Sequence, residues 1–285
     1  MSGKIAIEPA TAAIGANVRG IDLSRPLDAA TVGVIKAALT RHLVLFFRDQ
    51  PQLTTDAHVR FAKYFGDIDI PLFRTKSSDR PEVLVLDQVA PKGEGADSWH
   101  ADNTYMETPP MGSILQARLL PSFGGDTCFA SMSAAYDALS PVMRGFLDGM
   151  TATHSLAQMV ARTKHVAGAS LRDKVAAWPP VSHPIVRVHP DSGVKMLNVN
   201  ANWTVSIDGL TWEESTALLR FLLDHVKSPE FQVRLRWNVG DVAFWDNRAV
   251  QHYAVADYTE RRVMQRITIT GDKPFGPSNM RGLAA

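Results

Sequence analysis

The chain has almost no cysteine and no long apolar stretch. Cys128 is the only cysteine in 285 residues, so no disulfide can form within the chain, as is usual in a reducing compartment. No apolar run approaches the roughly 18 residues that a membrane-spanning helix requires. The first residues also lack the apolar segment of a secretory signal. These absences predict a cytoplasmic protein without a membrane partner.

The chain also lacks a strong charge of either sign. Thirty lysines and arginines offset 29 aspartates and glutamates, which gives a formal net charge of +1. We therefore expect no general attraction to nucleic acid or to an anionic membrane, and any preference for anions must come from local arginines. Internal repeats and low-complexity tracts are missing as well. The length suffices to bury a substantial core.

Short apolar segments bounded by turn residues dominate the chain. Strands are predicted at 43–47, 82–86, 112–120, 242–245 and 262–270. Helices are predicted after Asp28, Thr54 and Thr211, and Thr211 and Glu214 form a capping box. The pattern indicates a mainly β fold with flanking helices, either a sandwich or a barrel. It is consistent with a single domain, 1–285, that carries a lid-like insertion at about 156–180.

Two short motifs that lie far apart in the sequence indicate a metal site. The first contains His100 and Asp102, and the second places His252 after Trp245. In an extended segment residues i and i+2 project to the same side, so we expect His100 and Asp102 to reach one metal together, with His252 arriving from another strand. Two imidazoles and one carboxylate form the ligand set of non-heme Fe(II) sites, which leave three positions open. These three residues are called the metal triad below.

Two arginines follow the second motif in a predicted strand. Arg262 and Arg266 share one face of the extended segment and lie about 13 Å apart at roughly 3.3 Å per residue. A guanidinium can hold a carboxylate by two parallel hydrogen bonds. One arginine could therefore anchor a carboxylate-bearing cosubstrate while the other binds a second anion. Together with the triad, this predicts an oxygen-activating enzyme.

The ordered motifs resemble those of the Fe(II)/2-oxoglutarate-dependent dioxygenases typified by taurine dioxygenase. The resemblance covers nearly the whole chain, including Ile21 to Leu27, Trp99 to Asp102, Leu120 to Thr127, Trp245 to Arg248 and Gly271 to Phe275. It implies a double-stranded β-helix, or jelly-roll, core. It also implies a homo-oligomer, either a dimer or a tetramer.

The resemblance further implies a role for each motif residue. The metal triad matches the iron ligands. Thr127 and Arg262 match the residues that hold the distal carboxylate of 2-oxoglutarate, and Arg266 matches the arginine that binds the anionic group of the primary substrate. The implied reaction consumes O2, converts 2-oxoglutarate to succinate and CO2, and hydroxylates a substrate carbon.

The substrate region departs from taurine dioxygenase. The expected histidine is replaced by Ile70 or Pro71, the expected tyrosine by Phe73, and an expected amide by Ala96. Further apolar residues near the expected substrate position are Met159, Val160 and Trp203. Burying an ammonium group without partners is costly, so these changes disfavour taurine. We expect Arg266, Phe73 and Trp203 to bind an anion with a more apolar body, such as an alkyl sulfate, an alkyl sulfonate or an aryloxy acid.

Three alternatives remain open at this point. Taurine dioxygenase itself differs only in substrate. A zinc hydrolase could use the same triad with a metal-bound water, although it would not need the downstream arginines. An inactive jelly-roll binding module would keep the scaffold, but it would be expected to lack one of the metal ligands.

Overall fold

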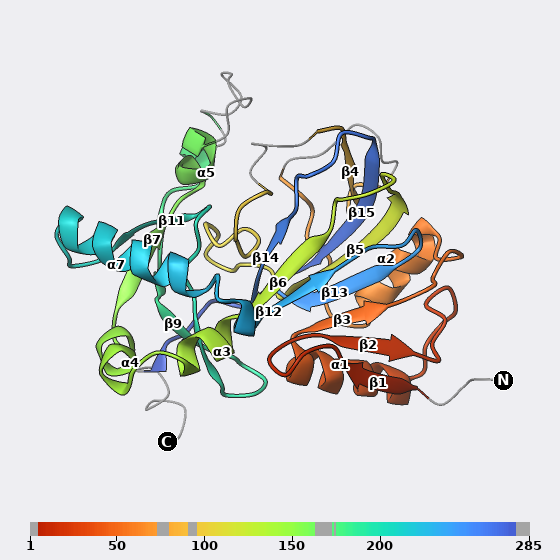
Figure 1. Cartoon of the computed structure of the whole chain (residues 1–285), viewed down its shortest axis with the longest axis horizontal. Coiled ribbons are helices and arrows are strands. Elements are labelled where there is room, and N and C mark those ends of the chain that lie inside the picture. The colour runs from red at the N-terminus through yellow and green to blue at the C-terminus, as the bar shows by residue number, and fades with distance from the viewer. Residues whose placement is uncertain (1–4, 73–79, 91–95, 163–172, 174, 278–285) are drawn as a thin grey trace.

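The computed structural model describes residues 5–72, 80–90, 96–162, 173 and 175–277. Strands dominate and helices flank them, so the predicted mainly β fold is confirmed. Figure 1 shows a large sheet on one side of the molecule and smaller sheets with further helices on the other. Within the described part of the chain, no helix has the length and hydropathy that crossing a membrane requires.

The large sheet has seven strands in the order β1-β2-β3-β13-β5-β15-β4. Its strands are β1 (Ala6–Pro9), β2 (Ala16–Arg19), β3 (Val44–Phe47), β4 (Leu84–Gln88), β5 (Gly112–Leu119), β13 (Val242–Asp246) and β15 (Arg262–Ile269). All neighbours are antiparallel except β2 and β3, which run parallel. The C-terminal strands β13 and β15 therefore lie on either side of β5, at the centre of the sheet.

A second sheet packs against one face of the large sheet. It has the order β12-β6-β14 and consists of β6 (Thr127–Ser131), β12 (Gln232–Leu235), which follows the 3-10 turn η1 (Pro229–Phe231), and β14 (Val250–Ala254). Along β13, Ala243 and Trp245 face this second sheet, whereas Val242 and Phe244 face the opposite side. Phe129 of the second sheet lies 5.6 Å from the Trp245 ring. The alternation gives the large sheet two buried faces.

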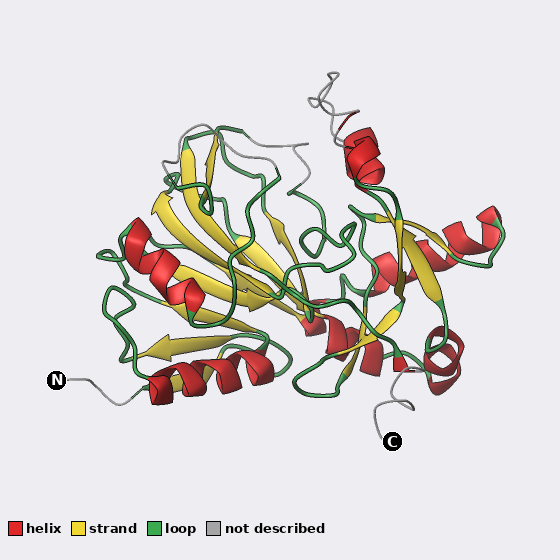
Figure 2. Cartoon of the chain, turned by 180° about the vertical axis from the view of Figure 1, so that it is seen from behind, coloured by secondary structure: helices red, strands yellow, loops and turns green. Residues whose placement is uncertain are grey.

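Helices α1 (Ala29–His42) and α2 (Thr55–Lys63) cover the outer face of the large sheet, as Figure 2 shows from behind. Asp28 caps α1 by accepting a hydrogen bond from the Thr31 backbone, and Thr54 caps α2 in the same way. These two predicted helix starts are confirmed. The metal triad lies on the inner face, where the His252 ring is 4.6 Å from the ring of Trp245.

The remaining elements form a smaller region beside the two sheets (Figure 1). They are α3 (Met132–Asp137), α4 (Pro141–Leu147), β7 (Thr151–His154), α5 (Leu156–Arg162), β8 (Val181–Pro184), β9 (Val186–Val188), β10 (Lys195–Leu197), β11 (Thr204–Ile207) and α7 (Trp212–His225). Strands β11-β7-β8 form one sheet and β10-β9 another. The capping box of Thr211 and Glu214 opens α7 as predicted. Of the expected lid, residues 163–172 and 174 lie outside the described residues, so the lid stays a prediction.

Candidate metal centre and active site

The structure brings the three residues of the metal triad together. Their potential ligand atoms all lie within 4.8 Å of one another, and all three side chains are buried. Asp102 Oδ1 lies 3.8 Å from His100 Nε2 and 4.0 Å from His252 Nε2. Two ligands of a single ion, each about 2.1 Å from it, are at most roughly 4.2 Å apart, so these two distances suit one shared metal.

The route by which the triad converges differs from the prediction. Residues 100–102 do not form a strand; His100 makes a single antiparallel bridge with His252, after which the chain turns. The bridge consists of two backbone hydrogen bonds of 3.0 and 2.8 Å between these two residues. The prediction that His100 and Asp102 project from one strand is therefore wrong. The bridge places the two imidazoles side by side, with ring centroids 4.4 Å apart.

Both imidazoles are prepared to act as neutral ligands. His100 Nδ1 donates to the Ser98 carbonyl at 2.7 Å, which leaves Nε2 without a proton on the side facing Asp102. Burial lowers the pKa of His100, and burial together with the neighbouring His100 lowers the pKa of His252 to about 3. A neutral imidazole is the form that binds a metal.

The carboxylate ligand is held through both its side chain and its backbone. Ser113 donates to Asp102 Oδ2 at 3.0 Å, and Arg266 donates to Oδ1 at 2.9 Å. The Asn247 amide accepts from the Asp102 backbone N–H at 2.7 Å and donates to its carbonyl at 2.9 Å. Burial alone would raise the pKa of Asp102, but Arg266 and the two imidazoles more than offset it and lower the pKa. The carboxylate is thus ionised and fixed in direction.

Arg262, four residues before Arg266 on β15, offers unused hydrogen-bond donors. Its residue is 3% exposed, and within the described residues its Nε and Nη2 have no hydrogen-bond partner. A Cβ placed on Gly125 would lie 3.1 Å from Arg262 Nε, so Gly125, two residues before Thr127, packs closely on the guanidinium. A buried cation with two free N–H groups is costly unless an anion joins it. The arrangement fits a carboxylate ligand.

Thr127 lies in β6 and its hydroxyl has a fixed partner that sequence analysis missed. Trp237 Nε1 donates to Thr127 Oγ1 at 3.0 Å, and both side chains are buried. Because the indole can only donate, the threonine hydroxyl keeps its own proton for another acceptor. This donor lies two residues along the chain from Gly125, which packs on the Arg262 guanidinium.

An apolar cluster around Tyr105 and Trp203 lies beside the metal centre. The cluster consists of Tyr105, Leu156 and Trp203, with Leu72, Met106, Met159, Val160, Val175 and Trp178 packed against it. Trp203 Nε1 donates to the carbonyl of Ala101, the residue between His100 and Asp102, at 2.8 Å. The Trp203 ring packs against Tyr105. Phe73 lies outside the described residues, and its predicted substrate contact stays a prediction. The Arg266 side chain is 18% exposed.

Three residues of the site carried no assignment from sequence: Ser113, Asn247 and Trp237. Asn247 stands inside the second motif, but the sequence does not say where its amide points. Ser113 and Trp237 contact residues that lie far away in the sequence, Asp102 and Thr127, and such contacts are not readable from the chain. For Ser113, the only sequence signal was its place in the predicted strand 112–120.

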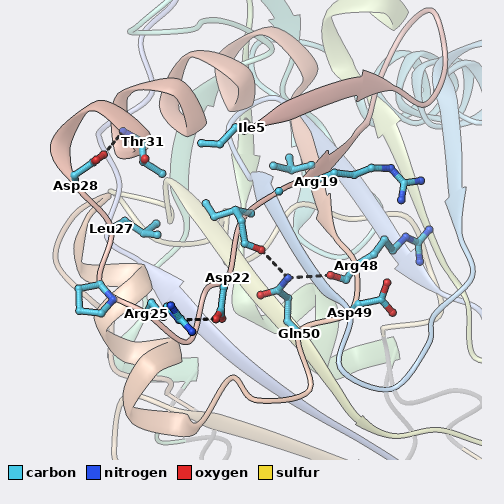
Figure 3. A pocket seen from close by; sticks show the side chains of 14 residues that line it. Ile5, Arg19, Asp22, Arg25, Leu27, Asp28, Thr31, Arg48, Asp49 and Gln50 are labelled. Atoms are coloured by element: carbon cyan, nitrogen blue, oxygen red, sulfur yellow. Dashed lines mark hydrogen bonds and ion pairs between the residues drawn. The ribbon is translucent and has the colours of Figure 1, made fainter. Parts of the chain in front are cut away.

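A separate surface hollow of about 820 Å³ contains no residue of this site. It lies between the 18–31 segment and residues 48–50 (Figure 3). Polar groups in its lining pair with each other or with the backbone: Arg25 pairs with Asp22 at 3.1 Å, and the Gln50 amide donates to two carbonyls. The metal centre and this hollow are therefore distinct features.

Known proteins show the same fold and the same sequence pattern. The family model "Taurine catabolism dioxygenase TauD, TfdA family" matches residues 6–268. The α-ketoglutarate-dependent sulfate ester dioxygenase of Pseudomonas putida is 40% identical over 277 residues, covering 95% of this chain and 91% of the relative. α-Ketoglutarate is another name for 2-oxoglutarate.

Two solved structures are similar over nearly their whole length. A taurine dioxygenase from Burkholderia xenovorans superposes with a TM-score of 0.82 at 37% identity, covering 96% of this chain and 93% of the other. AAD-2 in complex with Mn(II) and N-oxalylglycine gives 0.81 at 28% identity, with 95% and 99% covered. The chain therefore belongs to the TauD/TfdA family and is an α-ketoglutarate-dependent dioxygenase, an oxidoreductase.

Proposed function

We propose that the protein uses Fe(II), bound by His100, Asp102 and His252, to hydroxylate a small organic anion with sulfate esters as the first candidates. The observation that carries this proposal is that a buried triad occurs together with a buried arginine, Arg262, whose two N–H groups lack a partner among the described residues. A metal alone would leave those donors unsatisfied. A dicarboxylate that binds the metal with one end and Arg262 with the other satisfies them.

The chain's own groups then have separate tasks. Arg262 and the Thr127 hydroxyl bind the distal carboxylate of 2-oxoglutarate. Bound Fe(II) supplies the activation of O2 that couples decarboxylation of 2-oxoglutarate to oxidation of the substrate. Ser113 and Asn247 hold Asp102 in place, and the apolar cluster around Trp203 limits the access of water. N-oxalylglycine, bound in one structural neighbour, is a close chemical mimic of 2-oxoglutarate.

Arg266 and the apolar cluster support an amphiphilic anion as substrate. The guanidinium has a buried Nε with no hydrogen-bond partner in the described chain, while its Nη1 contacts Asp102. Leu72, Met159 and Trp178, which pack against the apolar cluster around Trp203, supply apolar surface. A sulfate ester has an anionic head that suits Arg266 and an apolar body that suits the apolar cluster. The named activity of the Pseudomonas putida relative is of the same class.

One observation favours taurine or another aminosulfonate as the second candidate. Asp69 is partly buried, and its carboxylate interacts electrostatically with Arg266, although burial raises its pKa overall. An ionised Asp69 would suit a substrate ammonium group and would oppose a purely anionic one. The choice between the two candidates therefore depends on whether the substrate carries a cation.

We further infer that the large sheet and the β12-β6-β14 sheet form a double-stranded β-helix, and that residues 156–180 act as a lid. The inner faces of these two sheets enclose the core and the triad, as that fold requires. Helix α5 begins directly at Leu156 of the apolar cluster. A homo-oligomer, proposed from the family resemblance, is tested by light scattering of the purified protein.

Anaerobic titration of the metal-free protein with Fe(II) and 2-oxoglutarate tests the cosubstrate site. We expect the weak visible charge-transfer band of the complex to appear with the wild type and with Arg261→Gln. Arg261 is exposed and pairs with Asp87, so this variant removes the same charge one residue away. Arg262→Gln should weaken 2-oxoglutarate binding by on the order of 100-fold, because buried charge-assisted hydrogen bonds are lost. Equal behaviour of the two variants would refute the assignment.

Succinate release then identifies the substrate class. We expect hexyl sulfate to stimulate succinate release more than taurine does. Hexyl sulfonate keeps the same apolar body with another anionic head group, and phenoxyacetate combines an aromatic body with a carboxylate. Asp69→Asn separates the two candidates further. If sulfate esters are the substrates, Asp69→Asn should keep or increase the rate of succinate release with hexyl sulfate. If taurine is the substrate, the same change should reduce the rate with taurine.

A further inference from the structure

The arginine expected to bind the substrate anion also contacts a metal ligand. Arg266 Nη1 lies 2.9 Å from Asp102 Oδ1, and the side chains are 18% and 5% exposed. This oxygen is also the one that lies 3.8 and 4.0 Å from the two imidazole Nε2 atoms. The guanidinium and a metal ion in the triad therefore share one carboxylate oxygen.

Two positive charges that share one buried carboxylate oxygen oppose each other. The repulsion is strong here because the Arg266 and Asp102 side chains are only 18% and 5% exposed, so their charges are weakly screened. The other Asp102 oxygen, Oδ2, accepts from Ser113, whereas the guanidinium donates to Oδ1. A negative group bound to Arg266 would neutralise the guanidinium and weaken its hold on Asp102 Oδ1.

The guanidinium still has a donor with which to receive such a group. Its Nε is buried and has no hydrogen-bond partner within the described residues. Asp69 is the other acid with which Arg266 interacts electrostatically, but among the described residues only Asp102 forms an ion pair with the guanidinium. Asp102 is therefore the main counter-charge of Arg266 until another anion binds.

We propose that Arg266 couples the metal site to the substrate site, so that a bound substrate anion strengthens metal binding and a bound metal strengthens anion binding. The two effects are equal in size, because coupling between binding sites is reciprocal. The inference rests on the proposed function, since it takes Arg266 as the anion-binding residue. It adds that substrate and metal each increase the affinity for the other without any contact between them.

Metal titration in the absence of 2-oxoglutarate tests the coupling without turnover. The probe metal is Mn(II), whose free form is counted by electron paramagnetic resonance, and the probe anion is hexyl sulfate. Hexanol is the matched ligand with the same apolar body and no charge. We expect saturating hexyl sulfate to tighten Mn(II) binding to the wild type by roughly tenfold, within the usual range of such couplings. Hexanol should leave Mn(II) affinity unchanged.

Two variants locate the effect at Arg266. Arg266→Gln keeps an N–H donor for Asp102 but removes the charge, so it should bind Mn(II) about as tightly as the wild type with hexyl sulfate, and hexyl sulfate should add nothing. Arg261→Gln, which removes an exposed arginine from the same chain segment, should respond as the wild type does. Calorimetry with and without Mn(II) should show the same factor in the affinity for hexyl sulfate.

Three results would overturn the inference. Hexyl sulfate could bind, by calorimetry, without changing Mn(II) affinity; it could fail to bind to the Mn(II)-loaded protein; or Arg266→Gln could bind Mn(II) more weakly than the wild type. Failure of the proposed function looks different, because then the triad would bind no metal or no compound would stimulate succinate release. The wild-type measurement stands alone if Arg266→Gln does not fold.

Discussion

The Asn247 amide holds the backbone on both sides of the Asp102 side chain. It accepts from the Asp102 N–H and donates to the Asp102 carbonyl, and all these groups are buried. Neither backbone group has a strand partner, because residues 101–102 lie in a turn beyond the single bridge. The amide therefore replaces the hydrogen bonds that a regular strand would have provided.

Removing this amide should weaken the metal site. We expect Asn247→Ala to lower Mn(II) affinity by about 10- to 100-fold, the usual effect of losing a group that orients a ligand. The free energy of unfolding should fall by about 1–3 kcal/mol, because buried backbone groups lose their partner. Asn198→Ala is the matched control, since Asn198 donates to the Pro184 carbonyl away from the triad. Equal Mn(II) affinities in the two variants would contradict the role of Asn247.

Trp237 should act on the cosubstrate only through Thr127. Trp237→Phe keeps an aromatic ring at this position but removes the N–H that fixes the threonine hydroxyl. We expect the affinity for 2-oxoglutarate to fall by about fivefold, since one neutral hydrogen bond is worth about 1 kcal/mol. In a Thr127→Val background the same change should have little further effect. Anaerobic titrations of the four proteins measure this, and simple additivity of the two losses would count against the assignment.

At the scale of single residues, the sequence was sufficient to identify those site residues whose type has few possible functions. A histidine–carboxylate–histidine set and two arginines on one strand face have a restricted chemistry, so their residue types and spacing were enough to single them out. Serine, asparagine and tryptophan have many uses. The roles of Ser113, Asn247 and Trp237 depend on which strands become neighbours, and the sequence does not state that.

At the scale of single elements, helix starts were predictable because their signals are local. Asp28, Thr54 and Thr211 each accept a hydrogen bond from the backbone three residues later. The segment around His100 gave no comparable signal. Three residues are too few to show a period, and the direction of their side chains is set by His252 and Asn247, which lie about 150 positions further along.

The capping box of α7 allows a test that separates stability from metal binding. Thr211 accepts from the Glu214 N–H, and the Glu214 side chain accepts from the Thr211 N–H. Thr211→Ala should lower the free energy of unfolding by about 1 kcal/mol without changing Mn(II) affinity. Thr40→Ala in α1 is the control, because the Thr40 hydroxyl donates to the Lys36 carbonyl and caps nothing. Urea unfolding of both variants would show the prediction wrong if they lost equal stability.

At the scale of the whole molecule, the sequence predicted the type of fold but not the order of its strands. Strand β13 lies between β3 and β5, so its partners come from positions about 200 and 130 residues earlier. Periodicity describes which face of a strand is buried and says nothing about its neighbour. The family resemblance could supply that order only because similar motifs imply a similar fold.

Buried histidines make the stability of the whole molecule depend on pH. His58 in α2 and His154 in β7 are both 0% exposed. Burial, with a smaller contribution from Arg118, lowers the pKa of His58 to about 3, and burial with the neighbouring His183 does the same for His154. In the unfolded chain each would titrate near 6.5. Below that pH the unfolded state therefore binds protons that the native state does not.

The sign of the effect follows from this difference in proton binding. Above pH 6.5, burial of the neutral His58 does not lower the free energy of unfolding. As the pH falls from 6.5 toward 3, the free energy of unfolding declines by about 1.4 kcal/mol per pH unit, because the unfolded state binds a proton at His58. His58→Leu removes this contribution, so the variant should lose less stability than the wild type between pH 6.5 and 5, a difference of about 2 kcal/mol. Urea unfolding at pH 7.5, 6.5, 5.8 and 5.0 measures it. Parallel pH profiles of the two proteins would mean that His58 already carries its proton in the native state.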